Sequence, residues 1–260
     1  KKRFPNINLY VDPVSHDGGT AIGLAKYAYY VHCKENEIEV PVKEKLDTLY
    51  LGIDRSYEIQ GFAAQVESND AFDVSKVNYN EIAELIADGN IVSLFQSRSE
   101  AGPRALGNRS ILFDPRVENG KDLVNVVKGR EWFRPFAGSV LLEDAAEWFD
   151  LAGLEESPFM MYAVDVNTSK LGEIPAITHV DNTCRVQTVT EEQNKHYYNL
   201  IKAFKDITGC PILFNTSFNL AGDPLVETLN DALYTIHNSK IKYLYLPEVE
   251  LLITMKDRED

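Results

Sequence analysis

The stretch from residue 191 to residue 214 constrains the fold most, because a strong helical pattern leads directly into an apolar strand. Between residues 191 and 207, apolar side chains recur at helical spacing, namely Tyr197, Leu200, Ile201, Phe204 and Ile207. Gly209 ends this predicted helix, and residues 211–214 form a short apolar run. A helix that returns at once to a strand is typical of a mixed sheet.

The rest of the chain also mixes helices and strands, without strict alternation. We predict further helices at residues 20–33, 80–89, 122–127 and 228–236, with Asn80 and Thr228 as candidate N-caps. We predict strands at residues 8–12, 91–95, 136–142, 159–166, 185–189 and 243–246. The fold class is therefore α/β (α+β) with an open sheet, and a domain boundary is expected between residues 45 and 75.

The charge of the chain is unevenly distributed. The net charge is −14, which argues against general binding of nucleic acids. Six of the ten arginines nevertheless lie between Arg98 and Arg134. Such a local basic cluster favours a pocket for a small anion, and the alternative is surface ion pairing.

Cysteine content and hydropathy bear on the compartment. The three cysteines are widely spaced and form no zinc-binding pattern, which fits a reduced, cytoplasmic setting. Neither a membrane span nor a signal peptide is expected. The chain begins without Met, which suggests a fragment of a longer protein.

Residues 97–110 form a Gly- and Arg-rich loop after an apolar strand. Glycine lets a backbone approach a ligand closely, and the guanidinium groups of Arg104 and Arg109 suit phosphate oxygens. The loop is not a Walker motif, because the Gly-Lys-Ser/Thr ending is missing. It either binds an anion or is a sharp turn with surface arginines.

Residues 128–136 carry a second cationic group. On an extended segment, Lys128, Arg130 and Arg134 would face the same way, and three cations on one face need an anion to neutralise them. The alternative is that their aliphatic stems cover Trp132 and Phe133.

Residues 214–219 and 179–187 supply polar groups beside predicted strands. Asn215, Ser217 and Asn219 follow a predicted strand, and α/β sheets bind ligands at the ends of their strands. The alternative is that these polar side chains stabilise a turn. His179 and Asp181 are a candidate acid–base or orienting pair. Arg185 is a candidate phosphate ligand.

Taken in order, these segments resemble the C-terminal domain of NodU/CmcH-type O-carbamoyltransferases. The matching motifs are SEAGPRALGNRS, VKxRExFRPFA, HVDxTxRxQTV and NTSFN, over roughly residues 90–240. The resemblance implies a YrdC-like twisted sheet around a basic cavity at residues 61–260. Lys128-x-Arg130 and Ser217-x-Asn219 look like the KxR and SxN signatures of YrdC-like proteins.

The resemblance also implies ligands and roles for these residues. Catalytic roles in handling carbamoyl phosphate and ATP would fall to Lys128, Arg130, Arg134, Arg185 and His179. Substrate or nucleotide binding would fall to Arg104, Arg109, Asn215, Ser217, Asn219, Gly18 and Gly19. The implied reaction forms carbamoyl adenylate with Mg²⁺ on the triphosphate, and the carbamoyl group then passes to a hydroxyl-bearing small-molecule acceptor.

The first 60 residues resemble the end of an actin-like ATPase-fold domain. His16-Asp17-Gly18-Gly19-Thr20 stands where that domain carries a Gly-Asp-Ala-Gly-like motif, so the resemblance implies that Asp17 binds Fe²⁺ or another divalent metal in the full-length protein. Taken alone, the motif indicates only a turn.

Several alternatives stay open at this stage. They are a threonylcarbamoyl-adenylate synthase with the same type of cavity, a non-catalytic nucleotide- or RNA-binding module, and a sugar-kinase-like ATPase. A homodimer is a further expectation, and no nucleic acid or membrane partner is expected.

Overall fold

The computed structural model describes residues 3, 6, 7, 9–40, 46–55, 61 and 71–256. Its helices are α1 (Gly19–Glu35), α3 (Tyr79–Ala87), α4 (Gly120–Lys128), α5 (Ala145–Trp148), α6 (Lys195–Thr208) and α7 (Leu229–His237). Its strands are β1 (Phe72–Lys76), β2 (Val92–Phe95), β3 (Arg109–Phe113), β4 (Ala137–Leu141), β5 (Phe149–Asp150), β6 (Tyr162–Val166), β7 (Thr183–Val189), β8 (Ile212–Ser217), β9 (Tyr243–Leu246) and β10 (Leu251–Met255). The predicted open α/β sheet is confirmed.

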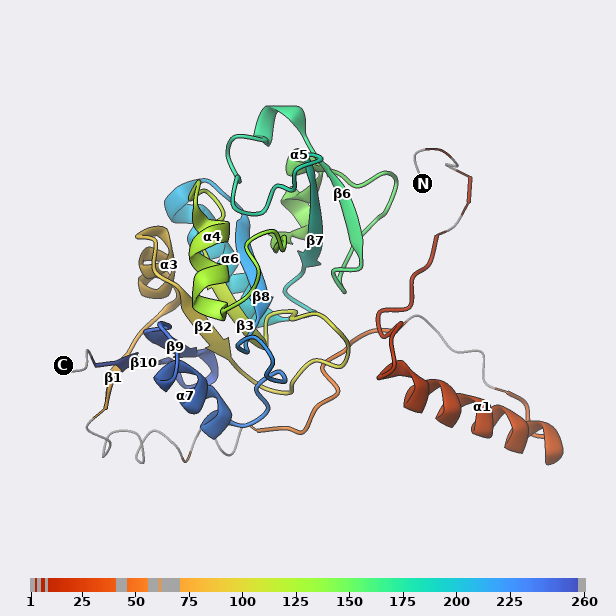
Figure 1. Ribbon diagram of the computed structural model, residues 1–260. Helices are drawn as coiled ribbons and strands as arrows, with labels where there is room; N and C mark the ends of the chain where they lie inside the picture. Colours follow the sequence, from red (N-terminus) through yellow and green to blue (C-terminus); the bar gives the residue numbers. More distant parts are fainter. Residues whose placement is uncertain are drawn as a thin grey trace.

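All of these strands belong to one mixed sheet with the order β1-β10-β9-β2-β3-β8-β4-β7-β6-β5. Parallel pairs join β2 to β9 and β4 to β7, and the other neighbours are antiparallel. The central strands β3, β8 and β4 come from distant parts of the sequence. Residues near 110, 140 and 215 are therefore brought side by side (Figure 1).

The sheet is buried on both faces around its centre. Helices α3 and α6 pack against each other over one face, and α7 contacts β9 (Figure 1). Side chains of a strand alternate between faces, so Tyr245 joins the core under α3 and α6, whereas its neighbours Leu244 and Leu246 join the core with α7. Burial on both faces explains why β2 is an apolar run rather than an alternating one.

The helix boundaries follow capping chemistry. Thr228 caps α7 in a capping box with Asp231, as predicted. The cap of α3 is Asn78 rather than the predicted Asn80, because Asn78 together with Glu81 closes a capping box two residues earlier. Gly209 ends α6 in the left-handed conformation, as a C-terminal glycine allows.

Four strands of the described residues, β1, β3, β5 and β10, were not predicted, and one predicted strand is wrong. The polar residues of β1 suggested a linker, β3 begins inside the predicted loop at Arg109, and β10 follows the last predicted strand. Residues 9–12 form no strand in the structure.

The N-terminal part reaches away from the sheet. Helix α1 stands apart from the body (Figure 1), and Cys33 is its one buried residue. Residues 46–52 lie closer to the body, where Leu49 O accepts a hydrogen bond from Ala101 N at 2.7 Å and Gly52 N donates to Ser99 O at 3.1 Å. The boundary predicted after residue 60 falls next to residues outside the described ones, so the division into domains 1–60 and 61–260 stays a prediction.

Within the described part of the chain, no helix combines the length and the apolar character that a bilayer crossing requires.

Candidate functional site

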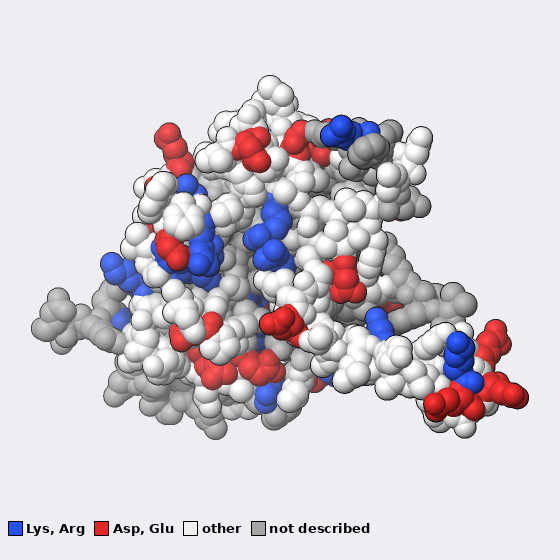
Figure 2. All heavy atoms as spheres, turned by 45° about the vertical axis from the view of Figure 1, so that its right-hand side comes forward, with Lys and Arg blue, Asp and Glu red and all other residues white. Residues whose placement is uncertain are grey.

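Four sequence segments converge at the ends of the central strands. Figure 2 shows Lys and Arg side chains on both sides of a recess near the middle of one face. Two adjoining cavities account for the convergence, and both contain residues from the loop after α4 and from the end of β8. We call them the arginine pocket and the lysine pocket.

The arginine pocket has a volume of about 290 Å³. It is lined by Pro103, Arg104, Ala105, Arg130, Arg134, Pro135, Met160, Arg185, Asn215, Thr216 and Ser217. None of these described residues is acidic, so the wall carries four positive charges without a negative one.

The lysine pocket has a volume of about 480 Å³. It is lined by Lys128, Gly129, Arg130, Glu131, Arg134, Ser217, Asn219, Leu220, Ala221 and Gly222. Arg130, Arg134 and Ser217 belong to both pockets, so the two cavities share a wall. Glu131 pairs with Arg134 at 2.6 Å on the exposed side.

The convergence does not come from an extended segment, and that part of the prediction is wrong. Lys128 is the last residue of α4, and Gly129 follows in the left-handed conformation with φ of 65°. Arg130 N then donates to Asn125 O at 3.0 Å. The chain thus reverses at Gly129, a conformation that glycine adopts without the steric cost of a side chain.

The arginine pocket leaves guanidinium nitrogens unsatisfied. Nε of Arg104, Arg130 and Arg185 is buried and has no hydrogen-bond partner. None of the three arginines forms an ion pair with a described residue. Burial is the main cause that lowers their pKa, to about 10 for Arg185, and the neighbouring Arg104 and Arg130 contribute to the shift at Arg185. Such a cluster of cations is unfavourable until an anion enters it.

Lys128 is held by the end of β8. Its ammonium group donates to Ser217 O, to Ser217 Oγ at 3.2 Å and to Asn219 Oδ1 at 3.0 Å. Burial and then the charge of Arg130 lower the pKa of Lys128 to about 7. The two predicted signatures, Lys128-x-Arg130 and Ser217-x-Asn219, therefore meet in space.

Asn215 lies beneath the arginine pocket in a buried polar network. Its Nδ2 donates to Ala105 O at 3.1 Å, to Ser139 Oγ at 3.0 Å and to Gln187 Oε1 at 3.3 Å. Its Oδ1 is buried without a donor. Gln187 Nε2 in turn donates to Leu106 O at 2.9 Å, so the network also supports the loop that carries Arg104.

Arg109 lies in the core rather than in either pocket. Its guanidinium stacks on the Phe95 ring at 3.6 Å and donates to the carbonyls of Gln96, Asn108 and Ser97. The side chain is completely buried. The structure thus separates Arg109 from the other predicted phosphate ligands, because it lies within strand β3 and not on the loop.

Glu100 is a residue that the sequence reasoning did not single out. Its buried Oε1 accepts hydrogen bonds from the backbone N–H groups of Leu106, Asn108 and Arg109 at 2.7–3.2 Å. Burial raises the pKa of this carboxyl, while the same N–H groups oppose the shift. A Glu inside a Gly- and Arg-rich loop was a usable signal, since a tight loop needs an acceptor for its inward-pointing amides.

His179 lies outside both pockets. Its Nε2 contacts Phe136 O at 3.0 Å and its Nδ1 contacts Thr183 Oγ1 at 3.0 Å. Thr183 Oγ1 donates to Asp181 Oδ1 at 2.7 Å, so Thr183 stands between the predicted pair. This arrangement orients the turn before β7 and places no acid or base against the cavities.

The N-terminal motif also lies outside the pockets. Asp17 and Gly18 are exposed, and Gly18 precedes α1, which begins at Gly19. No group of three or more His, Cys, Asp or Glu side chains among the described residues is arranged to hold a metal ion. Asp17 as a metal ligand and Gly18 and Gly19 as nucleotide ligands stay predictions.

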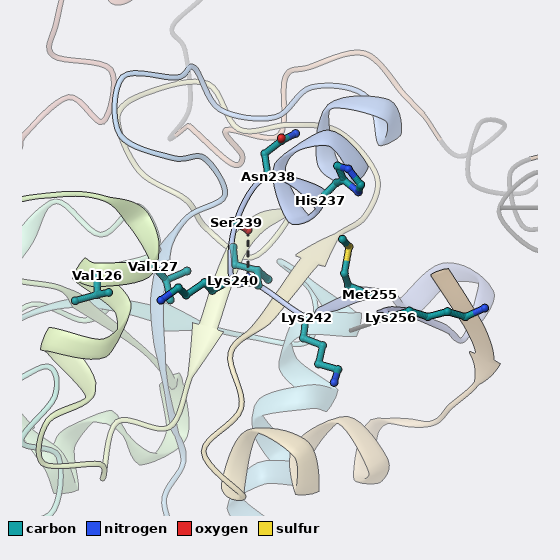
Figure 3. A pocket seen from close by; sticks show the side chains of 10 residues that line it. Val126, Val127, His237, Asn238, Ser239, Lys240, Lys242, Met255 and Lys256 are labelled. Atoms are coloured by element: carbon teal, nitrogen blue, oxygen red, sulfur yellow. Dashed lines mark hydrogen bonds between the residues drawn. The ribbon is translucent and has the colours of Figure 1, made fainter. Parts of the chain in front are cut away.

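A separate surface groove has a volume of about 580 Å³. It lies between α4, α7 and the ends of β9 and β10. Its lysines, Lys240, Lys242 and Lys256, point in different directions (Figure 3), and Lys256 pairs with Asp73 at 3.3 Å. Because its cations diverge, the groove lacks the convergent geometry of the arginine pocket.

Comparison with known proteins places the chain in a family. The family model described as "Carbamoyltransferase C-terminus" matches residues 83–252. Nodulation protein NolNO of Sinorhizobium fredii is 44% identical over 237 residues, which cover 88% of this chain and 33% of that protein. The 3'-hydroxymethylcephem-O-carbamoyltransferase of Amycolatopsis lactamdurans is 31% identical, over 86% of this chain and 40% of that protein.

The chain is thus shorter than these relatives, and spans less than half the length of each. A crystal structure of full-length HypF in the phosphate- and nucleotide-bound form is similar with a TM-score of 0.46 and 14% identity, over 73% of this chain and 23% of that one. That likeness is too weak to bear on the fold or on ligands. The family match and the sequence relatives suffice: the chain belongs to the carbamoyltransferase family, whose C-terminal region it carries at residues 83–252.

Proposed function

We propose that the two pockets bind carbamoyl phosphate and ATP and that the chain forms carbamoyl adenylate. One observation carries the proposal, namely the three buried, unpartnered guanidinium nitrogens of Arg104, Arg130 and Arg185 around a single cavity. Guanidinium groups bind phosphate with charge-assisted hydrogen bonds, and a bound phosphate would satisfy these donors. The family match supports a carbamoylated ligand.

The paired cavities support two phosphorylated ligands. The smaller arginine pocket suits carbamoyl phosphate, and the larger lysine pocket suits the phosphates of ATP. Arg130 and Arg134 belong to both, so they would lie where the two ligands meet. Positioning two reactants together is a major source of catalysis when the protein forms no covalent bond itself.

The proposed reaction has two steps. Water cleaves carbamoyl phosphate to carbamate and inorganic phosphate. A carbamate oxygen then attacks the α-phosphorus of ATP, the bond from that phosphorus to the bridging oxygen breaks, and pyrophosphate leaves. Lys128 and the arginines neutralise the oxygen charge that develops at phosphorus, which is the main requirement of phosphoryl-group chemistry.

The carbamoyl group would then pass to a hydroxyl of a small-molecule acceptor. The name of the Amycolatopsis relative describes O-carbamoylation of a hydroxymethyl group, which supports an acceptor of this kind. Mg²⁺ would neutralise phosphate charge, but the described residues offer no acidic cluster for it.

Binding and turnover test the proposal together. Calorimetric titration of the 260-residue chain with carbamoyl phosphate, and separately with ATP, should give saturable binding. Pyrophosphate should be released only when both are present. Arg185→Leu should weaken carbamoyl phosphate binding by about 10- to 100-fold, because it removes a charged donor to phosphate.

The matched control is Lys202→Met, which removes an exposed positive charge from α6 outside both pockets. It should bind both ligands like the wild type. Unaltered carbamoyl phosphate binding by Arg185→Leu would refute the site. Release of pyrophosphate with threonine and bicarbonate, but not with carbamoyl phosphate, would favour the threonylcarbamoyl-adenylate synthase instead.

A further inference from the structure

The arginine pocket has one unsatisfied acceptor in addition to its unsatisfied donors. Of the residues that line it, Arg104, Arg130 and Arg185 carry unpartnered nitrogens, and Asn215 carries an unpartnered oxygen. Asn215 is only 1% exposed, and its Oδ1 has almost no contact with solvent. A buried amide oxygen without a donor is costly, so it calls for a partner.

The orientation of the Asn215 amide is fixed by its neighbours. Ala105 O is a carbonyl and can only accept, so the group that faces it at 3.1 Å must be the NH₂. The same NH₂ is directed to Ser139 Oγ and Gln187 Oε1. Flipping the amide would place Oδ1 against a carbonyl, so Oδ1 stays on the side without a donor.

A ligand that satisfied both the guanidinium nitrogens and Oδ1 would combine an anionic end with a neutral N–H donor. A phosphate satisfies the guanidinium nitrogens, whereas a carboxamide NH₂ satisfies Oδ1. Acetyl phosphate has the same anionic end, but a methyl group stands in place of the NH₂. A site built to accept a hydrogen bond discriminates strongly against such an analogue, because its own polar group stays unpaired.

We propose that Asn215 Oδ1 accepts a hydrogen bond from the carbamoyl NH₂ and so selects carbamoyl phosphate over other acyl phosphates. The inference rests on the proposed function, because it concerns the ligand of the same pocket. Ser139, Gln187 and Ala105 act as positioning groups that hold the Asn215 amide in its selective orientation.

The test compares two stable phosphonates that differ only at the group facing Asn215. Phosphonoacetamide carries the NH₂, and acetonylphosphonate carries a methyl group at the same position. Calorimetric titration of the wild-type chain should show about tenfold or stronger preference for phosphonoacetamide. This comparison needs no variant, so it does not depend on whether a substitution folds.

Two variants sharpen the result. Asn215→Leu should abolish the preference, because phosphonoacetamide loses the acceptor for its NH₂; the lost hydrogen bond to Ala105 O weakens binding of both compounds alike and leaves their ratio unaffected. Ser217→Ala changes the same wall of the pocket. It should lower the affinity for both phosphonates in parallel, so the ratio of the two affinities should stay unchanged. Circular dichroism of each variant checks that it is folded.

The outcomes separate this inference from the proposed function. Equal binding of the two phosphonates by the wild type overturns the role of Asn215, as expected if a water molecule satisfies Oδ1, and leaves the anion pocket standing. The anion site itself is refuted if neither phosphonate binds and if carbamoyl phosphate and inorganic phosphate also fail to bind. The proposed role of Asn215 is then refuted as well.

Discussion

Arginines in two neighbouring regions of this molecule have opposite environments. In the core beside β2, Arg109 donates to the carbonyls of Gln96, Ser97 and Asn108 and stacks on Phe95. In the arginine pocket, the guanidinium groups of Arg130 and Arg185 have neither a hydrogen-bond partner nor a carboxylate partner among the described residues, whereas Arg109 shares with them only a buried Nε without a partner. The first region satisfies its charges from within the chain, and the second leaves them for a ligand.

This difference shows how arginines that stabilise the fold can be distinguished from arginines that are available to bind an anion. Both kinds occur within one sequence motif, and burial lowers the pKa of Arg109 and Arg185 alike, to about 10. The pKa shift therefore does not distinguish them. The partners of the terminal guanidinium nitrogens do, because both of these nitrogens of Arg109 already donate to backbone carbonyls, whereas those of Arg185 have no partner among the described residues.

The largest effect is expected from Arg109→Ala. This substitution removes a buried aromatic stacking partner and leaves four backbone carbonyls with fewer donors, so the free energy of unfolding should fall by about 3–5 kcal/mol. Urea denaturation measures this loss, and phosphate should not restore stability. If the variant were as stable as the wild type, Arg109 would not be a structural arginine, and the contrast with the arginine pocket would be wrong.

Arg185→Leu should have the opposite effect, because it should preserve ligand-free stability and abolish stabilisation by phosphate. It removes a cation that is repelled by Arg104 and Arg130, so the ligand-free protein should be as stable as the wild type or slightly more stable. Inorganic phosphate should stabilise the wild type but not this variant, which thermal melts with and without phosphate would show. A large loss of ligand-free stability would mean that Arg185, like Arg109, serves the fold.

Glu100→Gln tests the link between the two regions. The carboxylate accepts three backbone N–H groups of the loop that carries Arg104, and an amide accepts them less strongly. We expect about 1–3 kcal/mol of lost stability together with weaker phosphate binding. The control is Glu118→Gln, which neutralises an exposed carboxylate, and it should change neither quantity.

The smallest effect is expected from a change of pH, which should alter ATP affinity and ligand-free stability. Because the pKa of Lys128 is lowered to about 7, the ammonium loses its proton as the pH rises above 7, and ATP affinity should fall by up to about tenfold between pH 6.5 and pH 8.5. The unfolded chain keeps this proton up to about pH 10.4, so ligand-free stability should rise over the same window.

Two variants identify the source of that pH dependence. Lys128→Arg keeps a positive charge throughout the window, and Lys128→Met has none, so both should flatten the titration of ATP affinity measured by calorimetry. An unchanged slope in either variant would assign the titration to another group.

Much of the fold was predictable because it depends on local patterns. The apolar spacing of α6, its end at Gly209 and the capping box at Thr228 are all encoded within a few residues. Strand β1 was missed because its residues are mostly polar and exposed, and pairing with β10 rather than its own composition makes it a strand.

The candidate site was predictable in composition but not in arrangement. The motif resemblance predicts Lys128, Arg130, Ser217 and Asn219 as site residues, and they lie together in the structure. The same resemblance also included Arg109 and His179, which the structure places elsewhere. A motif match therefore does not distinguish a residue that binds the ligand from a residue that stabilises the fold.

The sequence by itself determined helices α1, α3, α4, α6 and α7, most strands, the family and the set of charged residues, because propensity, spacing and motif order are local properties. Only the tertiary structure decided which of those charges remain unsatisfied. Strand order brings residues near 105, 130, 185 and 215 to one cavity and turns Arg109 inward. Hydrogen-bond satisfaction depends on every neighbour in space, and those neighbours are distant in the chain.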